Sequence, residues 1–172
     1  MTMNTHASEP KRIIIFGNSG SGKSTLAKHL ATTLNIAHLD LDTLAWLPTE
    51  VPERAPIADS MQSINAFIRT QKNWVIEGCY SDLLAELTGH ASELIFMDLP
   101  IAACVENARN RPWEPHKYSS KEAQDANLPM LIDWITDYTA RSDTFSFAAH
   151  NALFGAYQGD KKRIVENSTE FQ

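Results

Sequence analysis

Short apolar runs alternate with longer stretches of helical periodicity along most of the chain. Five of the runs have the length and composition of strands, and they cover residues 13–16, 36–42, 74–77, 94–98 and 163–165. Between them, apolar residues recur at helical spacing over residues 24–34, 57–70, 81–87, 100–110 and 143–157. Strands that alternate with helices form βαβ units, whose strands are parallel. We therefore predict an α/β fold of three layers, in which helices cover both faces of a five-stranded parallel sheet.

The regular pattern breaks after the fourth helical stretch. Residues 111–120 (RPWEPHKYSS) hold two prolines among rings and charges, which is typical of a loop. Ser119 and Glu122 predict a capping box at the start of the helix that follows. Pro129 predicts a break in that helix near Asn127, because the residue before a proline avoids the helical conformation.

The length and composition of the chain favour a single domain. A chain of 172 residues, 43% hydrophobic and 21% charged, can bury a sizeable core. We expect one domain over residues 1–172, with a flexible lead-in at 1–11, a lid region at about 111–141 and a polar tail at 166–172.

The charge balance and the termini narrow the class of protein. A net charge of −6 makes nucleic acid an unlikely partner. No apolar run approaches the length that spans a bilayer, and the first residues lack the apolar core of a signal peptide. Cys79 and Cys104 suggest reduced thiols rather than a disulfide framework. We expect a cytoplasmic protein with no membrane partner, and the sequence leaves the oligomeric state unknown.

The segment between the first strand and the first helix carries the clearest chemical signal. Residues 17–24 read GNSGSGKS and fit the phosphate-binding pattern G-x-x-x-x-G-K-[ST]. Loop N–H groups and the helix N-terminus attract phosphate, Lys23 adds a positive charge, and the Ser24 hydroxyl is a ligand suited to Mg²⁺. The sequence thus predicts a site for ATP with Mg²⁺. The expected nucleotide-binding residues are Gly17, Asn18, Ser19, Gly20, Ser21, Gly22, Lys23, Ser24 and Thr25.

Acidic residues follow two of the predicted strands. Ligands of parallel sheets bind outside the carboxyl ends of the strands. Asp40 and Asp42 end the second strand and should face the same side of it, near the phosphate loop. Such a pair can hold Mg²⁺ through water and orient a substrate hydroxyl. Asp98 ends the fourth strand and is a candidate partner of Ser24 or of a Mg²⁺-bound water. The predicted metal site therefore comprises Ser24, Asp40 and Asp98, and solvated caps are the alternative interpretation of the acids.

Three motifs together resemble the small P-loop kinases. They are residues 17–24, 41–46 (LDTLAW) and 74–80 (WVIEGCY). This group includes adenylate-kinase-like and shikimate-kinase-like proteins and a subgroup called DNA-topology-modulation-like. The resemblance implies a P-loop NTPase fold that transfers the γ-phosphoryl group of Mg-ATP to a small-molecule acceptor. It also implies that Asp42 and the turn of Glu77 and Gly78 line the acceptor pocket. Trp46 and Tyr80 of the same motifs are further candidate substrate-binding residues, with packing as the alternative interpretation of Trp46.

The later half of the chain resembles the lid of these kinases. Arg111-Pro112 is similar to the R-P of shikimate-kinase-like proteins, and Arg141-x-Asp143 is similar to the R-x-D that ends an adenylate kinase lid. An arginine from a closing lid stabilises charge on the transferring phosphoryl group. The implied catalytic residues are Lys23, Asp42, Arg109, Arg111 and Arg141. For each arginine, a surface position at a helix end is the alternative interpretation.

Departures from these relatives leave the acceptor open. Shikimate kinases carry a run of glycines after the third strand, where this chain has Gly78 alone, and the paired arginines of adenylate kinases are not evident between Leu44 and Trp74. Neither shikimate nor AMP is supported. Two other functions remain possible: a regulator that binds nucleotide with little or no transferase activity, and a DNA-associated P-loop protein. A GTPase is disfavoured because the chain has no N-K-x-D motif.

Overall fold

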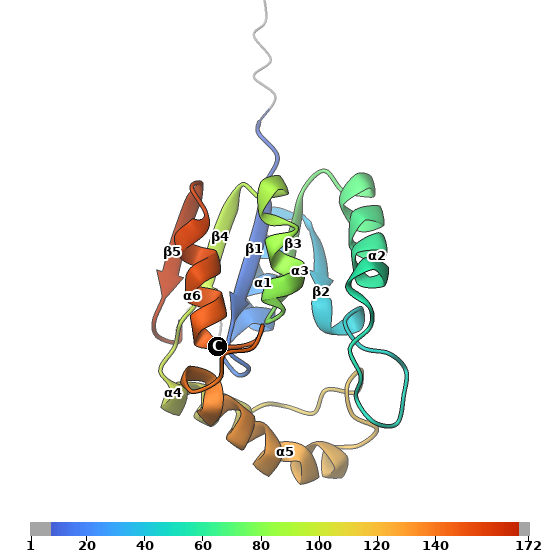
Figure 1. Ribbon diagram of the computed structural model, residues 1–172, viewed down its shortest axis with the longest axis vertical. Helices are drawn as coiled ribbons and strands as arrows, with labels where there is room; N and C mark the ends of the chain where they lie inside the picture. Colours follow the sequence, from blue (N-terminus) through green and yellow to red (C-terminus); the bar gives the residue numbers. More distant parts are fainter. Residues whose placement is uncertain (1–7, 169–172) are drawn as a thin grey trace, which may run out of the picture.

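A single parallel sheet of five strands organises the computed structural model, which describes residues 8–168. The expected lead-in and tail thus fall outside the described range at residues 1–7 and 169–172. The strand order is β2-β3-β1-β4-β5 (Figure 1). The strands are β1 Arg12–Gly17, β2 Ala37–Asp40, β3 Trp74–Gly78, β4 Glu93–Met97 and β5 Asp160–Ile164.

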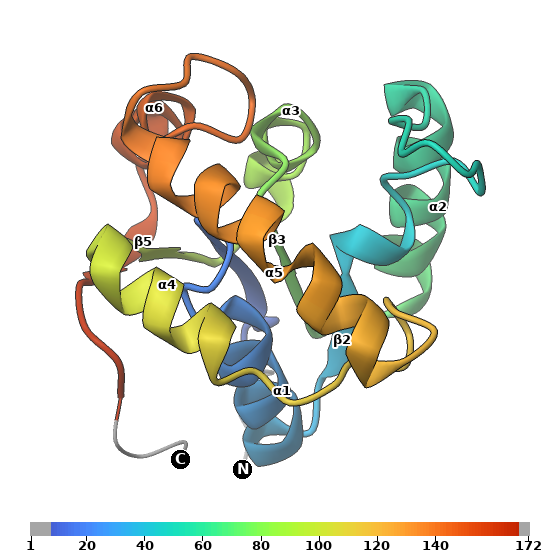
Figure 2. The same cartoon turned by 90° about the horizontal axis from the view of Figure 1, so that it is seen from below.

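Helices cover both faces of this sheet, as Figures 1 and 2 show. One face packs against α2 Ile57–Thr70, α3 Ser81–Ala85 and α6 Phe147–Ala156. The other packs against α1 Lys23–Leu34 and α4 Ile101–Arg109. The helix α5 Lys121–Thr136 crosses beyond the carboxyl ends of the strands (Figure 1). Three short 3₁₀ turns complete the described part: η1 Leu41–Thr43, η2 Thr88–His90 and η3 Asp137–Thr139. The predicted three-layer α/β fold is confirmed.

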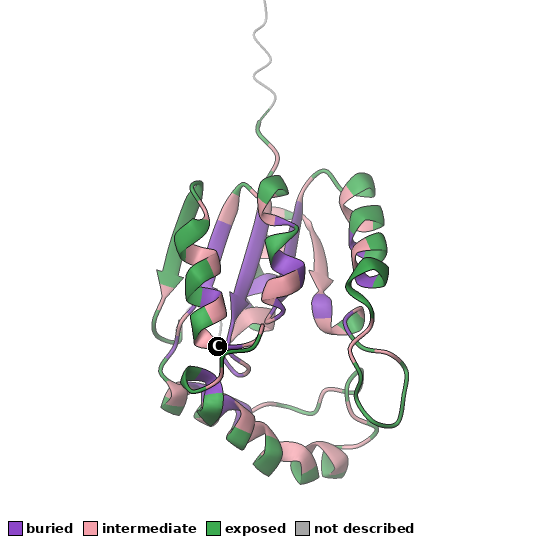
Figure 3. Cartoon of the chain, in the orientation of Figure 1, coloured by how far each residue is buried: buried purple, intermediate pink, exposed green. Residues whose placement is uncertain are grey.

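The burial of the strands explains their composition. Central parallel strands are covered on both faces and are therefore apolar throughout. Most residues of β1, β3 and β4 are buried, whereas β5 at the edge is largely exposed (Figure 3). The edge strand reads DKKRI, and charged side chains on an edge discourage pairing with another strand. Within residues 8–168, no helix is both long and apolar enough to cross a lipid bilayer.

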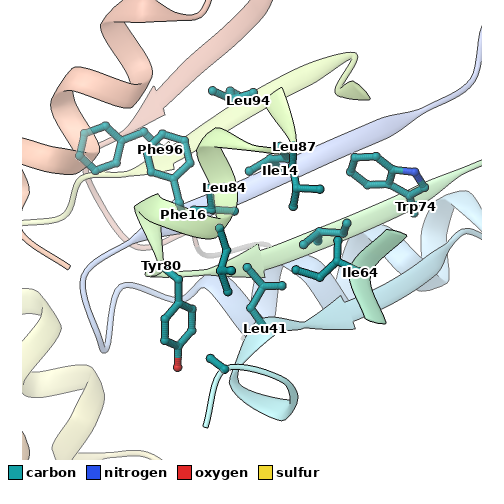
Figure 4. Packing of buried hydrophobic residues seen from close by; sticks show 13 residues of the cluster. Ile14, Phe16, Leu41, Ile64, Trp74, Tyr80, Leu84, Leu87, Leu94 and Phe96 are labelled. Atoms are coloured by element: carbon teal, nitrogen blue, oxygen red, sulfur yellow. The ribbon is translucent and has the colours of Figure 1, made fainter. Parts of the chain in front are cut away.

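The core forms one cluster on each side of the sheet. Figure 4 shows the cluster beneath α2 and α3, where the rings of Phe16 and Phe96 stack with centroids 5.0 Å apart. The opposite cluster joins Leu26 and Ala27 of α1 to Cys104 of α4. Together they hold β1 rigidly in the middle of the sheet, which places the loop that follows it.

The second strand is shorter than the alternating pattern predicts. β2 ends at Asp40, and the side chain of Asp40 accepts a hydrogen bond at 2.9 Å from the backbone N–H of Asp42 in η1. Asp40 thus caps this turn. Leu41 is fully buried within the turn, so the apolar periodicity continues past the end of the strand. The sequence pattern therefore does not show where β2 ends. Asp42 therefore does not lie on the strand.

The predicted break of the lid helix near Asn127 is wrong. α5 runs without interruption through Pro129 as far as Thr136. A proline removes one backbone hydrogen bond, to the carbonyl four residues earlier. Pro129 and Asp125 are both exposed, so water can replace that bond.

Two helix starts and one strand also differ from the prediction. Ser120, not Ser119, caps α5, because its side chain accepts a hydrogen bond from the backbone N–H of Ala123 at 3.0 Å. The last helix begins after its cap Ser146 rather than at residue 143. β5 begins three residues before the predicted strand, because its exposed lysines give no apolar signal.

Replacement of Ile76 by alanine tests the core. Ile76 is fully buried in β3, so Ile76→Ala should lower the free energy of unfolding by about 3 kcal/mol. Val51 is 77% exposed, and Val51→Ala should change it by less than about 0.5 kcal/mol. Urea unfolding followed by circular dichroism measures both, and equal effects of the two changes would contradict this description of the core.

Candidate active site

The loop of residues 17–24 turns sharply between β1 and α1. Gly17 and Gly20 have φ angles of 153° and 76°, which other residues rarely adopt. A Cβ at Gly17 would collide with the carbonyl oxygen of Met97, and one at Gly20 with that of Cys104. The loop is thus packed directly against β4 and α4, and only glycine fits at these two positions.

Side chains of the loop stabilise it by hydrogen bonds within the loop and to α5. Lys23 Nζ donates a hydrogen bond to the carbonyl of Asn18 at 2.7 Å, so the ammonium lies over the loop. The Asn18 amide donates to the carbonyl of Ile135 at 3.2 Å, which fastens the loop to α5. Of the predicted nucleotide-binding residues, those from Ser19 to Thr25 line a cleft, whereas Gly17 and Asn18 lie behind its wall.

This cleft has a volume of about 700 Å³, within the range of small-molecule sites. The phosphate loop, the ends of β2 and β3 and residues 111–117 line it, together with Asn107 of α4 and the residues that follow β5. The Asn107 amide donates at 2.8 Å both to the carbonyl of Gly20 and to the side chain of Asn167. The phosphate loop therefore shares one continuous cleft with the strand ends, the loop 111–117 and the residues after β5.

Glu77, at the end of β3, is the carboxylate next to Ser24. The Ser24 hydroxyl donates to Glu77 Oε1 at 2.8 Å, and Glu77 is 1% exposed. Its other oxygen, Oε2, is buried without a hydrogen-bond partner. The sequence predicts that Glu77 binds substrate. In the structure its carboxylate instead accepts a hydrogen bond from Ser24, at the start of α1.

Asp98 does not occupy the place that the sequence suggested. Its carboxylate forms an ion pair with Arg163 of β5 at 2.6 Å, and it does not line the cleft of about 700 Å³. Because β3 and β4 both flank β1, either strand end was a candidate. The contact with Ser24 that the sequence suggested for Asp98 is made by Glu77.

The surroundings of Glu77 oppose its negative charge. Burial, together with the neighbouring carboxylate of Asp40, raises the pKa of Glu77 to about 8. Parallel pairing places Asp40 of β2 directly opposite Glu77 of β3. The side-chain oxygens of the two acids and of Ser24 thus lie close together, next to the phosphate loop.

The surroundings of Asp42, unlike those of Glu77, favour the charged form of its carboxyl group. Its Oδ1 accepts a hydrogen bond from the Tyr80 hydroxyl at 2.5 Å, and its Oδ2 lies 3.0 Å from Lys117 Nζ. Although burial acts against it, the ammonium of Lys117 and the Tyr80 hydroxyl lower the pKa of Asp42. Burial also raises the pKa of Tyr80, so the phenol keeps its proton and donates a hydrogen bond to Asp42. Asp42 is a charged, oriented carboxylate that faces the cleft.

Trp46 and Arg54 support this arrangement from behind. Trp46 Nε1 donates to the Tyr80 hydroxyl at 2.7 Å, although the Trp46 side chain does not itself line the cleft. The guanidinium of Arg54 lies over the Tyr80 ring at 4.9 Å and pairs with Asp82 at 3.2 Å. Trp46 and Tyr80 thus orient Asp42 without lining the cleft themselves, whereas Gly78 lines it.

The three predicted lid arginines are in different environments. Arg111 lines the cleft and pairs with Glu114 at 3.5 Å. Arg109 is exposed on α4 near Glu106, and Arg141 stacks on Trp134 with its Cζ 3.5 Å from the ring centroid. Arg109 and Arg141 do not line the cleft. Of the three arginines, Arg111 alone lines this cleft.

Sequence reasoning missed Lys117, Glu114 and the pair Asn107–Asn167. Lys117 and Glu114 were visible as charged residues of the loop 111–120, but nothing in the sequence indicated which acids or bases they would meet. Asn107 lies on a helix face and Asn167 in the tail, and neither belongs to a motif. Their roles depend on the packing of segments that are distant in sequence.

A family model described as an AAA domain matches residues 13–127, more than half of the chain. The chain belongs to this AAA domain family. Its phosphate loop implies that the domain binds nucleotide. The "Uncharacterized protein YqaC" of Bacillus subtilis (strain 168) is 29% identical over 109 residues, which is 60% of this chain and 58% of that protein. The AAA domain thus aligns with little more than half the length of this relative.

Solved structures show a similar arrangement. A gluconokinase from Sinorhizobium meliloti 1021 superposes with a TM-score of 0.55 at 15% identity and covers 95% of this chain and 87% of its own. A shikimate kinase from Bacteroides thetaiotaomicron gives a TM-score of 0.45 at 18% identity, over 74% and 78% of the two chains. The superposition with the gluconokinase shows that the AAA domain shares the fold of that protein, and residues 17–24 give it the phosphate loop of P-loop proteins.

The raised pKa of Glu77 predicts a stability that depends on pH. The folded, metal-free domain retains a proton on Glu77 that the unfolded chain releases near pH 4.5, so the wild type loses stability as the pH rises towards 8. Glu77→Gln removes this loss and should unfold less readily than the wild type at pH 8.5, by on the order of 2 kcal/mol. At pH 5 the difference should be much smaller. Urea unfolding at both pH values measures it, and an equal difference at the two would contradict the raised pKa.

Proposed function

We propose that this AAA domain is a small-molecule kinase that transfers the γ-phosphoryl group of Mg-ATP to a hydroxyl-bearing acceptor. The observation that carries the proposal is the position of Asp42, a charged carboxylate that lines the same cleft as the phosphate loop. Such a group orients an acceptor hydroxyl and accelerates transfer to it, whereas binding of nucleotide alone does not use it.

The donor end of the cleft holds the triphosphate. The N–H groups of the loop and of the first turn of α1 bind the phosphates, and Lys23 balances their charge. The buried oxygen donors fit Mg²⁺, since Ser24, Glu77 and Asp40 offer the hard ligands that this ion prefers and Glu77 Oε2 lacks another partner. When bound, Mg²⁺ neutralises charge that develops on the phosphate oxygens. Asn107 and the residues after β5 are the proposed contacts of the nucleoside.

The acceptor end orients the attacking hydroxyl. Asp42 accepts the hydrogen bond of that hydroxyl and takes up its proton. The acceptor oxygen then forms a bond to the γ-phosphorus while the bond from that phosphorus to the bridging oxygen breaks, and ADP leaves with the electron pair. Tyr80 and Trp46 hold Asp42 in place, and Arg111 stabilises charge from the lid side.

A screen for ADP release tests the proposal directly. The protein is incubated with Mg-ATP and, separately, nucleoside monophosphates, sugar acids, neutral polyols and vitamin precursors, and ADP is measured by a coupled assay. Stimulation by one class of acceptor, with phosphate recovered on that compound, supports a kinase. Tight ATP binding without stimulation by any class favours a nucleotide-binding regulator instead.

Asp42→Asn separates catalysis from nucleotide binding. The amide keeps the shape of the side chain but cannot take up a proton, so turnover should fall about 100-fold or more. Affinity for ATP should remain within about threefold, because Asp42 contacts the acceptor rather than the donor. Asp59→Asn on the exposed start of α2 is a matched control and should leave both unchanged. Loss of ATP affinity in Asp42→Asn, measured by calorimetry, would refute the role proposed for Asp42.

Lys23→Met tests the donor end. Removal of the ammonium that lies over the loop should weaken ATP binding about tenfold or more. Lys72→Met, an exposed residue between α2 and β3, provides the same change of charge away from the cleft and should bind as the wild type does. Equal affinities of the two variants in calorimetric titrations would contradict nucleotide binding at this loop.

A further inference from the structure

Lys117 joins the loop that closes the cleft to the candidate catalytic carboxylate. Its Nζ lies 3.0 Å from Asp42 Oδ2, and the two side chains are 24% and 37% exposed. Lys117 belongs to the segment between α4 and α5, while Asp42 belongs to the turn after β2. The ion pair is thus a bridge between two wall segments of the cleft.

The closing loop holds Lys117 in position by its own charges. Glu114 Oε2 lies 3.7 Å from Lys117 Nζ and 3.5 Å from Arg111 Nη1. The backbone N–H of Glu114 donates to the side chain of Gln124 on α5 at 2.8 Å, and that side chain donates to the carbonyl of Pro112 at 3.1 Å. Because the loop is braced in this way, Lys117 reaches Asp42 as part of a defined structure.

Both oxygens of Asp42 are consequently engaged. Tyr80 bonds Oδ1 and Lys117 pairs with Oδ2, so the plane of the carboxylate is fixed from two sides. Each carboxylate oxygen has a second lone pair, which leaves room for an acceptor hydroxyl. Within residues 8–168, Lys117 is the cation with an ion pair to Asp42, while Arg109 and Arg141 do not line this cleft.

We propose that Lys117 is a positioning residue that acts through Asp42 and fastens the loop 111–120 over the acceptor end of the cleft. The proposal rests on the proposed kinase function and adds Lys117 to Arg111 as a second cation that the loop brings to the cleft. Closure of the loop then has two effects at once: it orients Asp42 for the acceptor hydroxyl, and it brings a positive charge to the side of the transferring phosphoryl group.

Hydrolysis of Mg-ATP with water as the acceptor provides the first test. Lys117→Gln should hydrolyse ATP about tenfold more slowly than the wild type, with ATP affinity within about threefold. Lys117→Arg, which keeps a cation within reach of Asp42, should recover most of the rate. Lys121→Gln changes the same charge in a surface pair with Asp125 and should match the wild type. A Lys117→Gln variant as fast as the wild type, or faster, would overturn the proposal, because Lys117 would then be neutral or inhibitory for Asp42.

Amide hydrogen exchange tests the closure without any turnover. With Mg²⁺ and adenylyl imidodiphosphate bound, Lys117→Gln and Asp42→Asn should each speed exchange over residues 111–118 about threefold relative to the wild type and to Lys121→Gln. The double variant should exchange no faster than either single variant, because both remove the same contact. Additive effects, or no effect, would show that the pair does not fasten the loop.

The two tests distinguish failure of this inference from failure of the proposed function. If the wild type binds no adenylyl imidodiphosphate, the kinase assignment fails, and the comparison of exchange rates in the nucleotide-free protein still decides whether the Lys117–Asp42 pair holds the loop. If nucleotide binds and the variants behave as the wild type does, the inference about Lys117 alone is refuted.

Discussion

Parallel pairing of β1 with β3 is the constraint on which the candidate site depends. The register sets Ile15 opposite Glu77 and Phe16 opposite Gly78, and the next strand sets Asp40 opposite Glu77. Ser24, which follows β1, therefore meets a carboxylate of the neighbouring strand at hydrogen-bond distance. A slip of one residue would turn Glu77 towards the other face of the sheet. The apolar clusters on both faces prevent such a slip, so the core fixes the chemistry of the cleft as well as the fold.

Two carboxylates in one cleft are kept in opposite states by their surroundings. Glu77 is buried beside another acid and favours the neutral form, whereas Asp42 has a cation and a phenol beside it and favours the charged form. Separate environments of this kind allow neighbouring acids to perform different tasks. In the proposed reaction Asp42 serves the acceptor end as a carboxylate, whereas Glu77 serves the donor end, where a bound Mg²⁺ would displace its proton. The difference comes from burial and ion pairing rather than from residue type.

Much of the fold could be predicted from local patterns, because buried parallel strands and the phosphate loop leave strong signals in adjacent residues. The partner of Ser24 could not, because Asp98 and Glu77 both end strands beside β1, and side-chain packing alone distinguishes them. The role of Lys117 could not be predicted for a similar reason, since its ion pair with Asp42 joins segments that are distant in sequence. Pro129 misled the prediction of α5, because a rule for the residue before proline does not include how exposed the helix is.

The bridge between Asn107 and Asn167 has a practical consequence for experiments on this protein. Asn167 and Ser168 form part of the wall of the cleft, although they lie within five residues of the last position in the chain. A variant that lacks Asn167 would thus lose part of this wall and a hydrogen bond of Asn107, whose amide also donates to the carbonyl of Gly20. Binding assays are therefore best performed with a protein that retains the residues up to Ser168.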